Sequence, residues 1–194
     1  MALLFQDIKD AADRLDIEPC AVQAVVDVES SGNGFGSGGC ILIQFEGHLF
    51  WKHLRKFGVA PEPLRPGNED ILYPSFTTRY VLGQIKEWDQ FTRASAIHAE
   101  AAMLSTSWGM FQILGQNHKA CGFDTVQEFV EAQQRGEKEQ LAAFCAFVRS
   151  EGMLHYLRLK DWAGFARRYN GPAYAANRYD KKMSAAYSRC ITKQ

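Results

Sequence analysis

The sequence predicts a mainly α-helical domain with one minor β element. Apolar residues recur at helical spacing through most of the chain, whereas only residues 40–46 combine β-branched residues with partial alternation. Hydrophobic residues make up 46% and charged residues 23% of the chain, as in ordinary globular proteins. A length of 194 residues suits one domain, so we expect residues 1–194 to form a single domain.

Two amphipathic helices are predicted at the start of the chain. The first covers residues 5–15, and the second begins near Pro19, which suits the first turn of a helix. In the second helix, Val22, Val26 and Glu29 share one stripe, so a carboxyl group should face the core. The glycine-rich residues 32–39 should end this helix in a tight turn.

A small hairpin is expected at residues 40–46, directly after the glycine-rich turn. Residues 48–57 are predicted to be helical, and residues 60–75, with four of the six prolines, form a long loop. Further helices are expected in the remaining part of the chain, at 78–105 as two helices, 124–134, 137–151, 153–169 with a break, and 175–189.

Two details of these later helices are predicted from spacing. Ile97, Glu100 and Leu104 share a stripe, so Glu100 should face inward. Asp124 and Gln127 form a capping-box-like start.

The cysteines, histidines and N-terminus exclude several classes of protein. The five cysteines are odd in number and lack a CxxC pair, which predicts buried free thiols rather than disulfides or a zinc site. The five histidines lack metal-ligand spacing, so we expect no metal and no cofactor. The first residues show no signal peptide, and no apolar run is long enough to cross a membrane, which predicts a cytosolic product.

The net charge of zero conceals an asymmetry. Residues 153–194 carry nine lysines or arginines against two acidic residues, a charge of +7, and residues 1–152 carry −7. A basic C-terminal region suits an anionic partner such as wall polymer, a membrane surface or nucleic acid, and a solvated helix face explains it equally well.

Glu29 is the strongest candidate for chemistry. Burial and the C-terminal end of a helix both disfavour its anion, so its pKa should be raised, as a general acid requires. Glycosidic bonds need such an acid because the leaving oxygen departs poorly until it is protonated. From spacing alone, a structural ion pair with arginine or lysine remains the stronger alternative.

Three separated motifs carry a resemblance to goose-type lysozymes and lytic transglycosylases. Val-Asp-Val-Glu-Ser-Ser-Gly at 26–32 resembles their helix-end Glu-Ser motif, in which the glutamate is the catalytic acid. Ser-Thr-Ser-Trp-Gly-Met-Phe-Gln-Ile-Leu-Gly at 105–115 resembles their groove-lining Gly-Leu-Met-Gln-Ile segment. Ala-Arg-Arg-Tyr-Asn-Gly-Pro-Ala-Tyr at 166–174 resembles the segment that brings a tyrosine and an asparagine beside the acid. Their common order makes coincidence hard to sustain.

The sequence is most similar to the N-acetylmuramidase family of phage endolysins, a resemblance that extends to Phe-Glu-Gly-His at 45–48 and Asn-Arg-Tyr at 177–179. It implies a lysozyme-like helical domain with a β-hairpin beside a glycan groove. The implied activity is cleavage between N-acetylmuramic acid and N-acetylglucosamine, which lyses bacteria. Carried over by position, Glu29 is the acid, and the substrate-binding residues are Ser31, Ser107, Gln112, Tyr169 and Asn170. Trp108 and Phe111 lie in the groove-lining motif, but packing in the core explains these two residues as well as contact with sugar rings does.

A second carboxylate is the least constrained part of the site. Glu46 is the preferred second catalytic residue, because a hairpin after the glycine turn would fold back over the end of the Glu29 helix. Glu100 is the rival, or it binds substrate and shapes the groove.

Alternative functions and partners follow from the same resemblance. A lytic transglycosylase producing 1,6-anhydromuramic ends would use the same acid, and a non-catalytic glycan-binding module would bind without turnover. The expected partners are peptidoglycan glycan strands and, through the basic C-terminal region, an anionic membrane or lipopolysaccharide, with no nucleic acid. We expect a monomer in the host cytoplasm that reaches the periplasm and cell wall at lysis.

Overall fold

The computed structural model describes residues 3–29, 33–81 and 83–193. Ser31, one of the residues expected to bind substrate, lies outside the described residues. The helices are α1 Phe5–Leu15, α2 Pro19–Glu29, α3 Gly47–Lys56, α4 Gln84–Leu104, α5 Val126–Arg135, α6 Glu137–Ser150, α7 Leu154–Leu159, α8 Trp162–Asn170 and α9 Tyr179–Ile191. The strands are β1 Ile43–Phe45, β2 Thr106–Trp108 and β3 Ile113–Leu114.

The β element is a small antiparallel sheet in the order β1-β2-β3. Residues 106–114 form the hairpin of this sheet, and β1 adds to it with Gln44 opposite Ser107. The segment expected to be a hairpin by itself therefore pairs mainly with a strand far along the chain. A short local hairpin also precedes β1, since Phe35 and Ile41 form an isolated antiparallel bridge.

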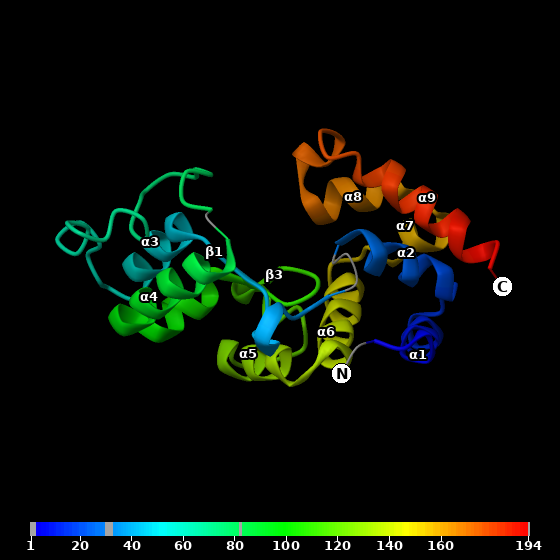
Figure 1. The fold of residues 1–194 in the computed structure, drawn as a ribbon, viewed down its shortest axis with the longest axis horizontal. Helices are drawn as coiled ribbons and strands as arrows, with labels where there is room; N and C mark the ends of the chain where they lie inside the picture. The colour runs from blue at the N-terminus through cyan, green and yellow to red at the C-terminus, as the bar shows by residue number, and fades with distance from the viewer. Residues whose placement is uncertain (1–2, 30–32, 82, 194) are drawn as a thin grey trace.

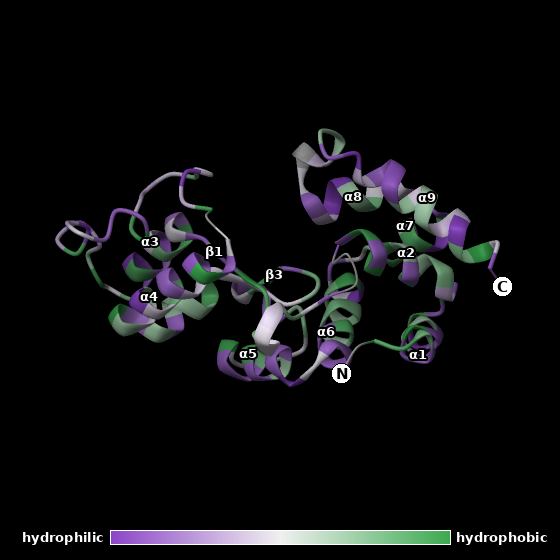
Figure 2. Ribbon diagram, in the orientation of Figure 1, coloured by the Kyte–Doolittle hydropathy of each residue, from purple (hydrophilic) through white to green (hydrophobic). Residues whose placement is uncertain are grey.

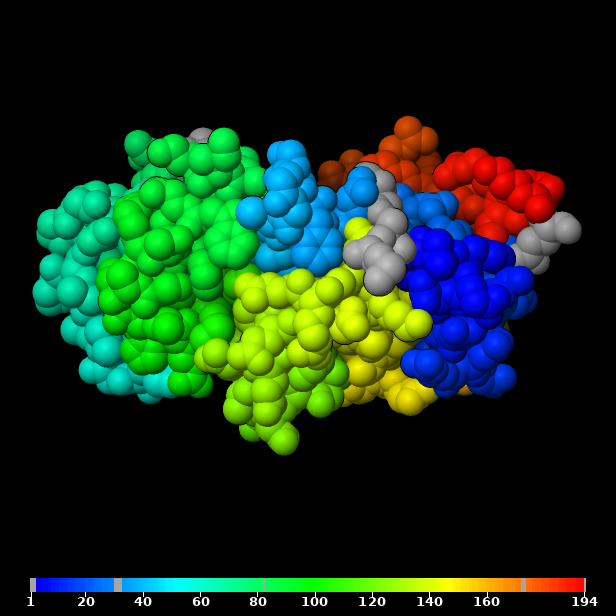
Figure 3. Space-filling model, turned by 60° about the horizontal axis from the view of Figure 1, so that its bottom comes forward, coloured from blue at the N-terminus to red at the C-terminus, as the bar shows by residue number. Residues whose placement is uncertain are grey.

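The helices divide into two lobes with the sheet between them (Figure 1). One lobe contains α3, α4 and the long loop, and its buried apolar residues form a small cluster that includes Phe50 and Leu54. The other contains α1, α2 and α6–α9, with a larger cluster that includes Val25, Phe144 and Phe165. Helices in both lobes combine polar and apolar residues, as amphipathic helices must (Figure 2). Residues 33–42 lie at the surface between the lobes when the molecule is turned (Figure 3).

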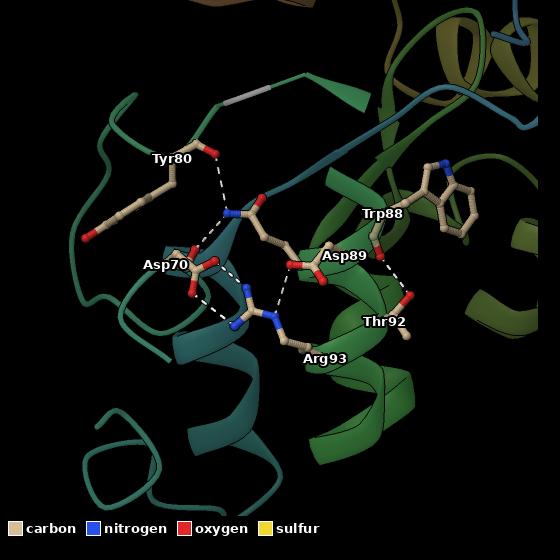
Figure 4. A network of polar contacts seen from close by, with 7 residues as sticks. Asp70, Tyr80, Trp88, Asp89, Thr92 and Arg93 are labelled. Atoms are coloured by element: carbon tan, nitrogen blue, oxygen red, sulfur yellow. Dashed lines mark hydrogen bonds and ion pairs between the residues drawn. The ribbon is translucent and has the colours of Figure 1, made fainter. Parts of the chain in front are cut away.

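The helix α4 is tied to the long loop of its lobe by a polar network (Figure 4). Arg93 donates from Nη1 to Asp70 Oδ1 at 3.1 Å and from Nη2 to the second oxygen of the same carboxylate. Arg93 Nε also donates to Asp89, one turn earlier on the helix. The buried Gln90 donates to the carbonyl oxygens of Asp70 and Tyr80. These bonds fix the N-terminal half of α4 relative to residues 70–80.

One expectation about α4 is confirmed and one is wrong. Residues 84–104 consist of two helical segments that meet at a kink at His98, whose φ of −160° and ψ of 100° are not helical, so the predicted division into two helices is present, although the first begins at Gln84 rather than near residue 78. Glu100 is exposed rather than inward-facing, because the buried face of α4 after the kink runs through Ala101 and Ala102. The helix start near residue 125 is also displaced by one position, since the capping box joins Thr125 and Glu128 rather than Asp124 and Gln127.

The expectation that all cysteines are free is wrong. Cys20 in α2 and Cys190 in α9 form a disulfide across a sequence separation of 170 residues. Of the remaining cysteines, Cys121 is buried, Cys145 is partly buried and Cys40 is exposed. No helix in the described residues is both long enough and apolar enough to cross a bilayer.

Candidate active site

Glu29 is the last residue of α2, as the sequence predicted. The residues before it on the same stripe, Val22, Val25 and Val26, are all buried. Burial raises the pKa of Glu29 to about 7, while the Asn170 hydrogen bond and the positive charge of Lys182 act in the opposite direction. A substantial fraction of the carboxyl group is therefore protonated near neutral pH, which is the state that a general acid needs.

Asn170, the last residue of α8, lies directly against this carboxyl group. Its Nδ2 donates to Glu29 Oε1 at 3.2 Å and to Oε2 at 3.1 Å. The preceding residue, Tyr169, donates its hydroxyl to the Phe111 carbonyl at 2.8 Å and stacks on Phe165. The expected grouping of Glu29, Tyr169 and Asn170 is thus present, with the tyrosine hydroxyl bound to the backbone.

The glycine segment and the Trp-Gly turn are held by the start of α6. Glu137 Oε1 accepts from the Gly34 backbone N–H at 2.9 Å. Gln140 Oε1 accepts from the Met110 N–H at 2.8 Å. An added Cβ at Gly34 or Gly109 would lie 2.0 Å or 2.7 Å from the Gln140 side chain, so both glycines permit this close approach. One buried helix end therefore positions both loops that border the carboxyl group.

A cavity of about 200 Å³ lies beside Glu29, between the two lobes. Its lining consists of Glu29, Asn33, Leu42, Ile43, Gln44, Val81, Gly83, Gln84, Glu87, Gly109, Met110 and Gln112. The three glutamine side chains can hydrogen-bond sugar hydroxyl and N-acetyl groups. Gln112 was predicted from the sequence, whereas Gln44, Gln84 and Glu87 were not, because their position in the same cavity as Glu29 depends on the packing of α4 against β1.

The other expected site residues lie elsewhere. Ser107 is a buried residue of β2 outside the cavity lining, and Glu100 is on the exposed face of α4. Glu46 is also outside the lining, and its Oε1 accepts from Gln44 Nε2 at 3.0 Å. Burial raises the pKa of Glu46, and the negative charge of Glu87 adds to this shift.

Trp108 and Phe111 belong to the core rather than to an open sugar-stacking surface. Trp108 is completely buried, and its indole N–H donates to the Met103 carbonyl at 3.2 Å. Phe111 is 2% exposed and stacks on Phe144. Among the described residues, no group of three histidine, cysteine, aspartate or glutamate side chains is arranged to hold a metal ion.

Comparisons with known proteins identify the family of the chain. The family model described as "Muramidase: N-acetylmuramidase" matches residues 18–191. The crystal structure of the Burkholderia AP3 phage endolysin superposes with a TM-score of 0.89 and 39% sequence identity, over 97% of this chain and 71% of that chain. A search of curated proteins found no match. The chain belongs to the N-acetylmuramidase family and is a glycoside hydrolase of the phage endolysin type.

Proposed function

We propose that this protein hydrolyses the bond between N-acetylmuramic acid and N-acetylglucosamine in peptidoglycan, with Glu29 as the general acid. The observation that carries the proposal is a carboxyl group with a pKa of about 7 at the edge of a polar cavity between the lobes. Support also comes from the order of the three motifs and from the match to a muramidase family. Cleavage of the wall by this route would lyse the bacterium.

The chemistry requires Glu29 to exist in two protonation states. The protonated carboxyl donates its proton to the glycosidic oxygen as the bond from that oxygen to the muramic C1 breaks. Asn170 Nδ2 then stabilises the carboxylate that remains, because it donates to both oxygens. The site thus favours the acid through burial and still accommodates its conjugate base.

A peptidoglycan zymogram tests this assignment. Glu29→Gln keeps the shape of the side chain but has no proton to donate, so we expect it to clear no wall at a loading where the wild type does. Glu100→Gln is the matched control, since Glu100 is exposed and outside the cavity lining. Equal clearing by wild type and Glu29→Gln would show that the proposed acid is wrong.

We also propose that the basic C-terminal region contacts an anionic membrane or lipopolysaccharide. Arg178, Lys181, Lys182 and Arg189 line a groove of about 490 Å³ along α9. Within the described chain none of these four forms an ion pair, so their charges are available to phosphate groups. Asp27 is the only acidic residue among the described residues that line this groove.

Vesicle co-sedimentation measures this contact. We expect wild type to bind vesicles that contain anionic lipid more than neutral ones, with less binding at high salt. The double variant Lys181→Glu, Arg189→Glu should lose this preference, whereas Lys52→Glu on α3 should retain it. Equal binding of all variants would assign these charges to a solvated surface.

The proposed cellular course follows from the endolysin relationship. We infer that residues 1–194 act as one monomeric catalytic unit, held in the host cytoplasm until lysis and then released to the periplasm and wall. Size-exclusion chromatography with light scattering tests the monomer, and fractionation of lysing cells tests the release.

A further inference from the structure

A second carboxyl group lines the cavity beside Glu29. Glu87 belongs to the first turn of α4, in the lobe opposite the one that carries α2 (Figure 1). It is 2% exposed, and it borders the same cavity as Glu29, together with Gln84 and Gln44. Two carboxyl groups on opposite walls of one cavity are the arrangement that glycoside hydrolysis uses.

The two oxygens of Glu87 differ in their surroundings. Oε2 accepts from the backbone N–H of Phe45 at 2.7 Å. Oε1 has no hydrogen-bond partner within the described chain, although the side chain is buried. The bond to Phe45 therefore fixes the carboxyl group and leaves one oxygen for a molecule in the cavity.

Neighbouring residues of α4 hold Glu87 against the free edge of β1. The side chain of Gln84 forms two hydrogen bonds with the backbone of Ile43. Gln84 Nε2 donates to the Ile43 carbonyl at 2.8 Å, and the Ile43 N–H donates to Gln84 Oε1 at 3.0 Å. Trp88 Nε1 donates to the Ile41 carbonyl at 3.2 Å. The opposite edge of β1 pairs with β2, which leads into the turn at Gly109 that also lines the cavity. The sheet thus holds Glu87 in a fixed position relative to that turn.

Glu46 offers a weaker geometry for the same role. Gln44 Nε2 contacts its Oε1, and His48 Nδ1 lies 3.3 Å from its Oε2, so both oxygens have close neighbours. Glu46 does not border the cavity that contains Glu29. Of the two carboxyl groups, Glu87 is the one placed to reach a molecule between the lobes.

We propose that Glu87 is the general base that activates the attacking water, which extends the proposed hydrolysis at Glu29. Glu87 takes a proton from the water as the water oxygen forms a bond to the muramic C1. The bond from C1 to the glycosidic oxygen breaks, and that oxygen receives the proton of Glu29. One water is consumed, the products are a reducing muramic end and a free 4-hydroxyl, and both carboxyl groups then exchange a proton with solvent.

Steady-state kinetics on soluble glycan strands tests this assignment. Glu87→Gln keeps an oxygen for the Phe45 N–H but removes the base, so kcat should fall about 100-fold or more, with KM changed only a few-fold. Glu46→Gln should keep kcat within a few-fold of wild type. A Glu87→Gln variant with near-wild-type kcat would overturn the proposal, and a large loss in Glu46→Gln alone would assign the base to Glu46.

Azide rescue separates a base from a structural residue. Azide is already an anion and needs no deprotonation, so it should restore turnover to Glu87→Ala and leave an azide-capped muramic end visible by mass spectrometry. A structural role predicts no rescue, and an inactive Glu87→Ala that azide leaves inactive would contradict the proposal. Glu29→Gln should not be rescued, because the leaving oxygen still lacks its proton.

Product analysis distinguishes this inference from the function on which it rests. If wild type releases only 1,6-anhydromuramic ends, no water attacks, and the role of Glu87 is refuted while wall cleavage by Glu29 stands. If wild type does not cleave the strands at all, the proposed function itself fails. Reducible ends from wild type, with their loss in Glu87→Gln, support both.

Discussion

Glu29 is held between opposing influences on its ionisation. Burial favours the protonated form, and the C-terminal end of α2 repels the anion. Asn170 and Lys182 favour the carboxylate, so they limit how far the pKa rises. The general acid that we propose must both release and regain a proton and would benefit from this balance, because a much higher pKa would make it a poor proton donor.

Removing the Asn170 hydrogen bond should change the pH dependence of catalysis. The bond stabilises the anion, so Asn170→Ala should raise the pKa of Glu29 above about 7. Activity that requires the protonated acid is lost as pH rises through this pKa, so the alkaline limb of kcat/KM should move to higher pH. Lys182→Met should move it in the same direction, since it removes a positive charge. A limb that stays in place in both variants would contradict the assignment of that limb to Glu29.

The raised pKa of Glu29 in the wild type also makes the stability of the protein depend on pH. The folded-state pKa of about 7 exceeds the usual glutamate pKa of 4.5, so wild-type stability falls as pH rises from 4.5 through 7. Once Glu29 is ionised, the penalty is about 3 kcal/mol. We expect Glu29→Gln to be more stable than wild type by up to about this amount at pH 8 and little different at pH 4, measured by urea unfolding. Glu100→Gln, at an exposed position, should show no such pH-dependent gain.

At the scale of elements, local periodicity predicted the helices well. The predicted span 5–15 agrees with α1, and the stripe ending at Glu29 agrees with α2. Contacts between segments far apart in the chain could not be predicted, because no local pattern in the sequence indicates them. Glu87 accepts a hydrogen bond from the backbone of Phe45, 42 positions away, and the disulfide joins residues 170 positions apart. The stripe through Glu100 was misplaced, because the buried face of this segment of α4 runs through Ala101 and Ala102.

The disulfide should stabilise the pairing of α2 with α9. It connects the helix that ends in Glu29 to the helix that carries Lys182, near the two ends of the chain. We expect Cys190→Ser to lower the free energy of unfolding by about 2–5 kcal/mol in oxidised protein. Cys40→Ser is the control, because Cys40 is an exposed free thiol. Identical urea midpoints for wild type with and without reductant would show that the bond does not form in solution.

At the scale of the whole molecule, the two apolar clusters correspond to the two walls of the cavity. The larger cluster packs the helices that supply Glu29 and Asn170, and the smaller one packs α3 and α4, which carries Gln84 and Glu87. Phe91 packs against both clusters. The geometry of the proposed active site therefore depends on two cores of unequal size remaining folded together.

Hydrogen exchange should show that the smaller core can open separately. Phe50→Ala empties a fully buried site in the smaller cluster, at a cost of about 3–5 kcal/mol. Because few apolar residues remain to hold that lobe, we expect faster exchange in residues 43–104 and unchanged protection in α2 and α6. Activity should also be lost, because the lobe that carries Glu87 would separate from the lobe that carries Glu29. Phe144→Ala, the matched change in the larger cluster, should accelerate exchange in both lobes. Uniform acceleration by Phe50→Ala would instead mean that the two lobes unfold as one cooperative unit.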